Sequence, residues 1–237
     1  PAHRPPPAVE LVQLRFAHAD AAPSVIGGLH LRVASGERVA ITGPSGAGKS
    51  TLLALIAGLV PAQSGAVVID GVTLDDQSAP RLRARMAWIG QKPHVFAGTL
   101  GANVALGRPD VDAQAVGHAL EAATLEQLAG REAGRPLGES GIGLSGGECL
   151  RLAMARAAAA PGSDLWLADE PTAHLDAATA RELTRRLLAQ SAGRTLIVAT
   201  HDPELASHMD RVIDLAALRP APADTEMAAL AAVGAAS

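Results

Sequence analysis

The chain has 237 residues, a formal net charge of −4 and 48% hydrophobic residues, which is enough sequence for one large or two small domains with a substantial core. The negative charge gives no electrostatic reason to expect nucleic acid as a partner. The longest apolar run, residues 52–60, is far shorter than the roughly 20 residues of a membrane-spanning helix, so a soluble chain is expected. Cys149 is the only cysteine, which excludes an internal disulfide and favours a reducing compartment.

The first residues predict a linker followed by several short strands. The chain begins with Pro1 and not with methionine, so we expect it to be a piece cut from a longer protein. Residues 1–8 are proline-rich, which is typical of an extended linker, and a chain end without a role is an equally weighted alternative. Strands are then predicted at residues 9–16, 25–33, 37–41 and 67–69. Strands in such quick succession favour a small antiparallel sheet beside the main core.

A glycine-rich stretch lies directly between a buried strand and a buried helix. Residues 39–41 predict the strand, and residues 52–57 predict the helix, which is expected to end near Gly58. The residues between them are Gly43, Pro44, Ser45, Gly46, Ala47, Gly48, Lys49, Ser50 and Thr51. They fit the pattern G-x-x-x-x-G-K-[ST] of a phosphate-binding loop. The strand-to-helix context favours this interpretation over an ordinary glycine-rich turn.

The residue types of this loop suit a bound polyphosphate. Gly46 and Gly48 let the backbone curl so that successive N–H groups face phosphate oxygens, and the helix N-terminus adds a favourable dipole. Lys49 would place its charge on the β- and γ-phosphates, and the Ser50 hydroxyl can ligate Mg²⁺. The loop therefore predicts a nucleoside triphosphate and Mg²⁺ as ligands.

The middle of the chain is predicted to be helical. Residues 86–91 form another short apolar strand that ends in Gln91, and no strand pattern follows it before residue 160. Helical spacing is found at residues 99–106, 112–122, 124–129 and from residue 148 to about residue 160. Leu150, Met154 and Ala157 share one face of the last helix, which Pro161 and Gly162 end. This region, about residues 92–160, predicts a helical insertion.

The last third of the chain alternates strands and helices. Strands are predicted at residues 165–168, 195–200 and 211–215, and a helix capped by Asp176 is predicted to run to about residue 190. Residues 216–237 are alanine-rich without a clear period, which fits a loose helix or a disordered tail. Strands alternating with helices around a phosphate loop predict an α/β fold with a mainly parallel sheet that is covered on both faces.

Two carboxylates follow the predicted strand at residues 165–168. Asp169 and Glu170 lie at its carboxyl end, where open α/β sheets bind their ligands. Asp169 would hold Mg²⁺, and Glu170 would polarise the attacking water as general base. An acidic pair that merely ends a strand is the alternative. The phosphate loop upstream favours the catalytic interpretation.

Together, these motifs resemble the nucleotide-binding domain of an ATP-binding cassette (ABC) protein. The motifs that carry the resemblance are residues 43–51, Gln91, Leu144, Ser145, Gly146, Gly147, Glu148, Asp169, Glu170, Asp176 and His201. The resemblance covers about residues 9–215. It implies a RecA-like P-loop NTPase core with an antiparallel β subdomain and a helical subdomain. It also implies ATP hydrolysis with Mg²⁺, and a head-to-tail dimer of two such domains with ATP between them.

The resemblance assigns roles to several single residues. Gln91 would contact Mg²⁺ and the attacking water, and His201 would donate a hydrogen bond to the γ-phosphate. A histidine with a purely structural role is the alternative for His201. Asp176 would be the D-loop residue and one of the nucleotide-binding residues, and it can also cap its helix.

The signature and the adenine site need separate comment. Ser145, Gly146 and Gly147 stand at a predicted helix N-terminus, and in the family this surface meets the ATP of the opposite subunit. Glu148 stands where glutamine is more common, which adds a negative charge. The family stacks adenine on an aromatic residue, often tyrosine. This chain has no tyrosine, and His18 occupies the matching position, where it would stack more weakly or serve only as a loop residue.

The segment after Gln91 resembles that of exporters. Residues 91–100 with Asn103 match the exporter pattern, and residues 138–141 resemble the exporter cross-subunit loop. This implies a half-transporter at the cytoplasmic face of the inner membrane, with a membrane domain upstream of Pro1 whose coupling helices contact the helical insertion. A soluble ABC ATPase that does not transport, and a module that binds ATP but hydrolyses it poorly, are the alternatives.

Residues 169–176, with His174, resemble the CydD subunits of heterodimeric thiol exporters. That family moves glutathione or cysteine during cytochrome bd assembly, so the resemblance implies a thiol substrate. An exporter of a lipid, a peptide or a drug is the alternative.

Overall fold

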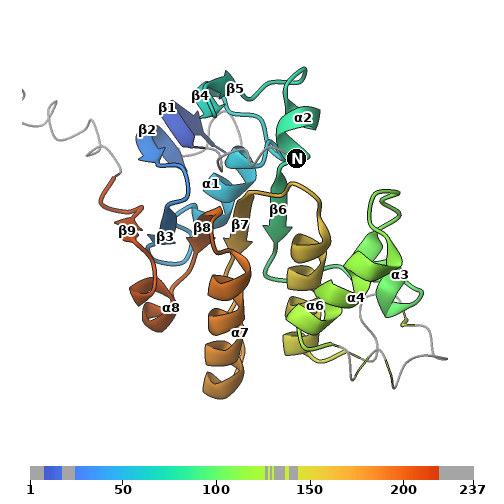
Figure 1. Cartoon of the computed structure of the whole chain (residues 1–237). Helices are drawn as coiled ribbons and strands as arrows, with labels where there is room; N and C mark the ends of the chain where they lie inside the picture. The colour runs from blue at the N-terminus through green and yellow to red at the C-terminus, as the bar shows by residue number, and fades with distance from the viewer. Residues whose placement is uncertain are drawn as a thin grey trace, which may run out of the picture.

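The protein is described as a computed structural model that covers residues 8–17, 25–125, 128, 130, 137–138 and 144–218. Two sheets and a group of helices make up these residues (Figure 1). In these ranges, no helix is both long enough and apolar enough to cross a membrane.

A five-stranded parallel sheet forms the centre of the fold. Its strand order is β6 (Met86–Ile89), β7 (Leu165–Asp169), β8 (Thr195–Ala199), β3 (Arg38–Thr42) and β9 (Arg211–Asp214). Every neighbouring pair in it is parallel. β7 and β8 are buried along their whole length, as expected for parallel strands that are covered on both faces. The predicted parallel sheet is therefore confirmed.

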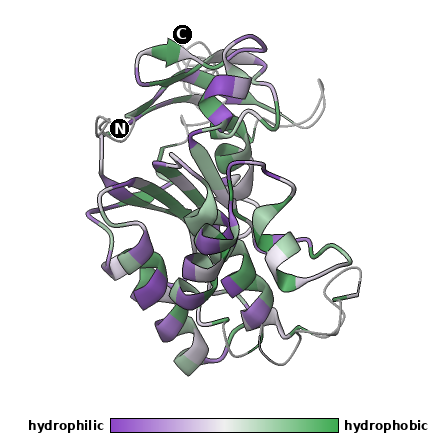
Figure 2. Ribbon diagram, turned by 45° about the vertical axis from the view of Figure 1, so that its right-hand side comes forward, coloured by the Kyte–Doolittle hydropathy of each residue, from purple (hydrophilic) through white to green (hydrophobic). Residues whose placement is uncertain are grey.

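Helices cover both faces of this sheet. Helix α1 (Lys49–Ile56) packs on one face, and helices α6 (Gly146–Ala159) and α7 (Ala177–Gln190) pack on the other (Figure 1). Side chains alternate along β3, so that Ile41 lies in the core beneath α1 while Ala40 lies in the core beneath α6 and α7. Figure 2 shows the same pattern, with hydrophobic residues in the strands and hydrophilic residues on the outer turns of the helices.

A second, antiparallel sheet lies beside the first. Its order is β2 (Ile26–Val33), β1 (Val9–Phe16), β4 (Ser64–Ile69) and β5 (Val72–Thr73). One of the four strands expected here does not belong to it: residues 37–41 correspond to β3, which pairs with β8 and β9 in the parallel sheet. The reason is burial, because Val39, Ala40 and Ile41 are all fully buried and need cover on both faces.

The helical region packs against one side of α6. Helices α3 (Leu100–Ala105) and α4 (Ala113–Ala122) share a separate apolar cluster with the side of α6 that includes Leu152 and Ala155. The helix predicted at residues 124–129 lies partly outside the described residues. Two short helices, α2 (Ala79–Arg83) and α8 (Pro203–Ser207), were not predicted from the sequence, because five-residue helices carry little periodicity.

Candidate nucleotide-binding site

The phosphate loop leaves the end of β3 and enters α1. Gly46 and Gly48 have φ angles of 77° and 97°, a left-handed backbone that glycine adopts without strain. Gly48 also allows close packing, because a Cβ there would lie 2.7 Å from Cγ1 of Val25. The loop curls around Lys49, whose Nζ donates a hydrogen bond of 2.9 Å to the Gly43 carbonyl. The loop thus has the geometry that the sequence predicted.

A hydroxyl and a carboxylate meet next to the loop. Ser50, in the first turn of α1, donates a hydrogen bond of 2.9 Å from Oγ to Oδ1 of Asp169 at the end of β7. Asp169 is only 8% exposed, and this burial raises its pKa, against the opposing effect of the Ser50 hydrogen bond. Two adjacent oxygen donors fit Mg²⁺, which takes one or two protein ligands together with water and phosphate oxygens.

Glu170 lies between a cation and a histidine. Its Oε1 is 3.5 Å from Nζ of Lys49, and its Oε2 is 2.7 Å from Nδ1 of His201. The backbone N–H of His201 also donates to Oε2, at 3.2 Å. Glu170 has a φ of 47°, and such strain in a non-glycine residue is often found at functional sites. The structure therefore brings together Lys49, Glu170 and His201, which the sequence had predicted to act on one ligand.

Two further residues join the loops that carry this cluster. The hydroxyl of Thr172 donates a hydrogen bond of 2.9 Å to Oδ2 of Asp202, and the other oxygen of Asp202 accepts from the N–H groups of Glu204 and Leu205 at the start of α8. The loop after β7 is thereby tied to the loop after β8. The sequence analysis missed this contact, although Asp202 before Pro203 is a typical helix start.

The signature lies at the start of α6, where its serine is hydrogen-bonded within its own helix. Ser145 and Glu148 form a capping box, in which the Ser145 hydroxyl accepts from the Glu148 N–H at 3.3 Å and the Glu148 carboxylate accepts from the Ser145 N–H at 2.7 Å. The charge of Glu148 is thus directed at its own helix start. Ser145 and Gly146 are exposed. In the described part of the chain, no hydrogen bond links Ser145 to Lys49 or Glu170.

Other predicted residues stand apart from the cluster. Gln91 follows β6, is exposed, and makes no hydrogen bond with any described residue. Asp176 caps α7 by accepting from the N–H groups of Ala178 and Thr179 at 3.1 Å each. The hydroxyl and N–H of Thr179 lower the pKa of Asp176. His18 and residues 139–141 lie outside the described residues.

Comparison with known proteins gives a consistent picture. The ABC transporter family profile matches residues 26–173. The mycobactin import ATP-binding/permease protein IrtB of Mycolicibacterium thermoresistibile is 37% identical over 210 residues, which cover 87% of this chain and 36% of that protein. The ATP-dependent lipid A-core flippase of Chromohalobacter salexigens is 34% identical over 203 residues, which cover 84% of this chain and 35% of that protein.

A solved structure is also similar. A bacterial Atm1-family ABC exporter with ATP bound matches with a TM-score of 0.77 and 31% sequence identity, over 89% of this chain and 38% of that chain. The chain thus spans little more than a third of the length of the proteins that it matches.

Proposed function

We propose, from the premise that this chain belongs to the ABC transporter family, that its ATPase activity drives an exporter. The fold and the family make the chain an ABC transporter ATPase domain. The relatives include a flippase and an Atm1-family exporter, which supports the exporter type. The membrane domain, the partner and the substrate of the whole protein are part of this proposal.

The observation that carries the proposal is the cluster at the edge of the parallel sheet. Ser50 and Asp169 are 2.9 Å apart, and Glu170 lies within 3.5 Å of Lys49 and 2.7 Å of His201. Phosphoryl transfer to water needs a cation for the phosphates, ligands for Mg²⁺ and a base that orients the water. These five side chains supply each of those functions in one place.

In the proposed mechanism, each residue acts on a defined atom. Lys49 binds the β- and γ-phosphate oxygens, and the N–H groups of the loop from Gly43 to Gly48 bind the remaining phosphate oxygens. Ser50 and Asp169 would hold Mg²⁺, which when bound supplies positive charge to the phosphates. Glu170 accepts a proton from the attacking water, and His201 donates a hydrogen bond to the γ-phosphate.

The contacts of Glu170 correspond to the state of this mechanism before ATP binds. Both of its carboxylate oxygens are occupied, one near Lys49 and the other by His201. A triphosphate would compete for Lys49, because three phosphate groups attract the ammonium more strongly than a single carboxylate does. We infer that ATP binding draws Lys49 away from Glu170 and leaves that carboxylate free to orient water.

The remaining predicted residues act in a dimer in this proposal. Ser145, Gly146 and Gly147 would bind the γ-phosphate of an ATP held by the partner, because they are exposed or at a helix start and do not reach the cluster of their own chain. Asp176 would lie at the same interface. Gln91 would reach Mg²⁺ and water only after the helical region moves, and His18 would stack on adenine.

A thiol substrate is the second, narrower candidate. One residue favours it, because His174 stands where the sequence resembles CydD. His174 lies in the loop before α7, is exposed and has a φ of 62°. The relatives named above bear the names of a mycobactin importer and a lipid A flippase. ATP-dependent uptake of glutathione or cysteine into inverted vesicles, driven by the full-length transporter, is the expected result. No uptake above the level of a Glu170→Gln transporter contradicts a thiol substrate.

The proposed catalytic role is tested with Glu170→Gln. This change keeps the size of the side chain and removes the base, so we expect ATP hydrolysis by the purified chain to fall by about 100-fold or more. ATP binding should remain, because Lys49 and the loop are unchanged. Glu121→Gln is the matched control, since Glu121 is exposed on α4 far along the chain from the cluster. Equal rates for Glu170→Gln and the parent chain would remove Glu170 from the mechanism.

A further inference from the structure

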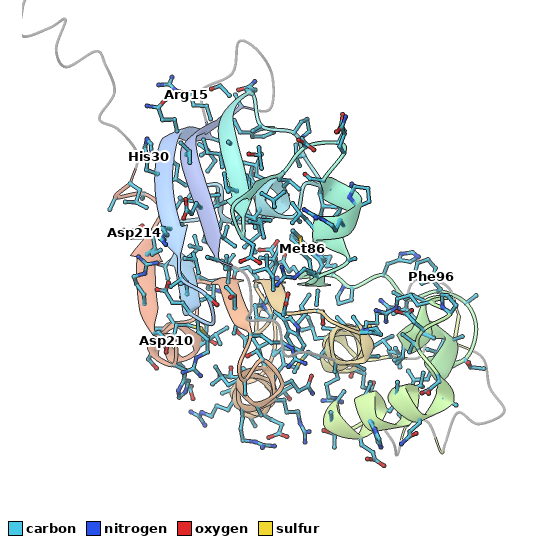
Figure 3. The ribbon with its side chains drawn as sticks, turned by 45° about the horizontal axis from the view of Figure 1, so that its top comes forward. Arg15, His30, Met86, Phe96, Asp210 and Asp214 are labelled. Atoms are coloured by element: carbon cyan, nitrogen blue, oxygen red, sulfur yellow. The ribbon has the colours of Figure 1, made fainter. Side chains whose placement is uncertain are left out.

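An exposed aromatic segment lies next to the helical region. The segment of residues 94–96 follows β6, and its Phe96 is 51% exposed. Figure 3 shows Phe96 at the side of the molecule where α3 and α4 lie, away from Met86 of β6. Phe96, Ala102 and Leu106 line a groove of about 260 Å³. In the proposed transporter, this is the surface that would face the membrane domain.

The backbone of this segment is held by one buried side chain. Asn103 of α3 is 2% exposed. Its Oδ1 accepts from the Phe96 N–H at 2.9 Å, and its Nδ2 donates to the Phe96 carbonyl at 2.8 Å and to the Thr99 carbonyl at 3.1 Å. An amide that bonds both backbone groups of one residue fixes that residue firmly. Phe96 is therefore clamped to α3 although its ring faces solvent.

A guanidinium from α6 completes the clamp. Arg156 donates from Nη1 to the His94 carbonyl at 2.6 Å, from Nε to the Asn103 carbonyl at 2.8 Å and from Nη2 to Asn103 Oδ1 at 2.9 Å. It also lies over the Phe96 ring, with Cζ 5.8 Å from the ring centroid. No carboxylate takes part among the described residues, and burial lowers the pKa of Arg156. A partly buried charge is thus used to hold the positions of the His94 and Asn103 carbonyls.

The same helix begins with the signature. Ser145 caps α6, and Arg156 lies within its last turns. At about 1.5 Å per residue, the two are roughly 16 Å apart along a single helix. A rigid helix would connect the surface at Phe96 to the ligand groups at Ser145.

We propose that Arg156 is a positioning residue for ATP hydrolysis, whose guanidinium fixes residues 94–96 to the signature helix so that this surface and Ser145 move as one unit. The proposal rests on the proposed function, because only an ABC dimer uses Ser145 on a partner's ATP. Arginine is needed for its geometry, since three separate nitrogens of its planar fork bond the three acceptors, whereas the three N–H groups of a lysine ammonium all leave one nitrogen. Arg156→Lys is therefore the informative variant, because it keeps the charge.

Arg108 provides a matched control. Its guanidinium donates to the carbonyls of Val104, Ala105 and Arg156 at 2.9, 3.0 and 3.2 Å. It is also a partly buried arginine, and burial lowers its pKa. Like Arg156, it connects the end of α3 to α6, but among the described residues its hydrogen bonds do not include residues 94–96. Arg108→Lys therefore disrupts a similar set of hydrogen bonds between α3 and α6 and leaves the hydrogen bonds that hold Phe96 intact.

The first experiment measures the clamp without reference to activity. Amide hydrogen exchange is followed in the 237-residue parent chain, in Arg156→Lys and in Arg108→Lys. We expect exchange at the Phe96 N–H to accelerate about tenfold in Arg156→Lys, because Asn103 loses its anchor, and to stay within twofold of the parent in Arg108→Lys. Equal exchange rates of the Phe96 N–H in the two variants contradict the claim that Arg156 holds Phe96 in place.

The second experiment measures its effect on catalysis. We expect kcat for ATP to fall about tenfold in Arg156→Lys with KM within twofold of the parent, because the ATP grip of the phosphate loop is untouched while the signature is displaced. Arg108→Lys should keep at least half of the parent kcat. If Arg156→Lys exchanges faster at the Phe96 N–H but keeps the parent kcat, Arg156 is not a positioning residue for hydrolysis. A rise in KM without a fall in kcat contradicts that role as well.

The two experiments separate the two levels of inference. A parent chain that dimerises with ATP but does not hydrolyse it contradicts the proposed function and, with it, a positioning role in hydrolysis, while the exchange result still decides whether the clamp exists. A parent chain that hydrolyses ATP while Arg156→Lys matches it in kcat contradicts only the positioning role. Melting temperatures of both lysine variants show whether either is poorly folded, and exchange in β7 and β8 serves as the internal reference.

Discussion

The cluster proposed for catalysis and the signature are built in opposite ways. Ser50, Asp169, Glu170 and His201 come from three separate parts of the chain and bond to one another across the carboxyl edge of the parallel sheet. Ser145 instead bonds to a residue three positions away in its own helix and stays exposed. The first site is assembled by long-range packing, and the second is a local structure that presents its groups outward.

This difference indicates which half of the site a single chain can complete. The cluster has a cation, carboxylates and an imidazole already within contact distance of one another. In the signature, the Ser145 N–H and hydroxyl already donate to Glu148, so Ser145 binds a phosphate only by exchanging those bonds for bonds to the anion. A single chain is therefore expected to bind ATP through the cluster, and hydrolysis is expected to require a second chain.

The largest effect is expected from a substitution in the cluster, which tests its proposed role in hydrolysis directly. Asp169→Asn keeps the acceptor for the Ser50 hydroxyl but removes the carboxylate proposed to hold Mg²⁺. We expect hydrolysis to fall by about 1000-fold, because the lost charge stabilisation amounts to several kcal/mol. ATP turnover at saturating Mg²⁺ is the measurement. Residual activity above about a tenth of the parent rate would show that Asp169 does not have this role.

A smaller effect is expected from the signature. Ser145→Ala should lower hydrolysis by about 10- to 100-fold, because one donor to the partner's phosphate is lost, while binding of a fluorescent ATP analogue to dilute protein is unchanged. It should also cost about 1 kcal/mol of stability as a lost N-cap.

The matched control for that variant is Asp112→Ala. Asp112 caps α4 by accepting from the Ala115 N–H at 2.7 Å, so its loss should lower stability by a similar amount and leave hydrolysis intact. If the two variants lose activity equally, the loss reflects a weakened helix start, and the proposed division between the halves fails.

The smallest effect concerns the stability of the cluster without nucleotide. Burial raises the pKa of Asp169, so the folded chain holds this proton more tightly than the unfolded chain does. This group's contribution to stability is therefore present at low pH and is lost as the pH rises through the ordinary aspartate range toward the raised pKa. Near pH 7, Asp169→Asn should melt at a higher temperature than the parent chain.

That stability gain should shrink on acidification. Melting curves between pH 7 and about pH 4, with Glu121→Gln as the control for loss of a surface charge, give the comparison. A gain that grows as the pH falls contradicts an unfavourably buried Asp169 carboxylate.

Local patterns were enough to predict much of the fold. The strands of the parallel sheet, helices α4 and α7 and the cap at Asp176 fell within one or two residues of the predicted positions, because period, burial and capping act between near neighbours. The grouping of β3 with the antiparallel strands was wrong, because sheet membership depends on partners far along the chain. The short helices α2 and α8 gave no periodic signal.

The sequence by itself determined which chemical groups this protein has: a loop with the pattern of a phosphate-binding loop, carboxylates that end a buried strand, and a serine with two glycines at a helix start. Only the tertiary structure decided which of these meet. It paired Ser50 with Asp169 and Glu170 with Lys49 and His201, and it left Gln91 and Ser145 apart from them. The physical reason is that a motif is a short-range property of the backbone, whereas contacts across strands and helices depend on how the whole core packs.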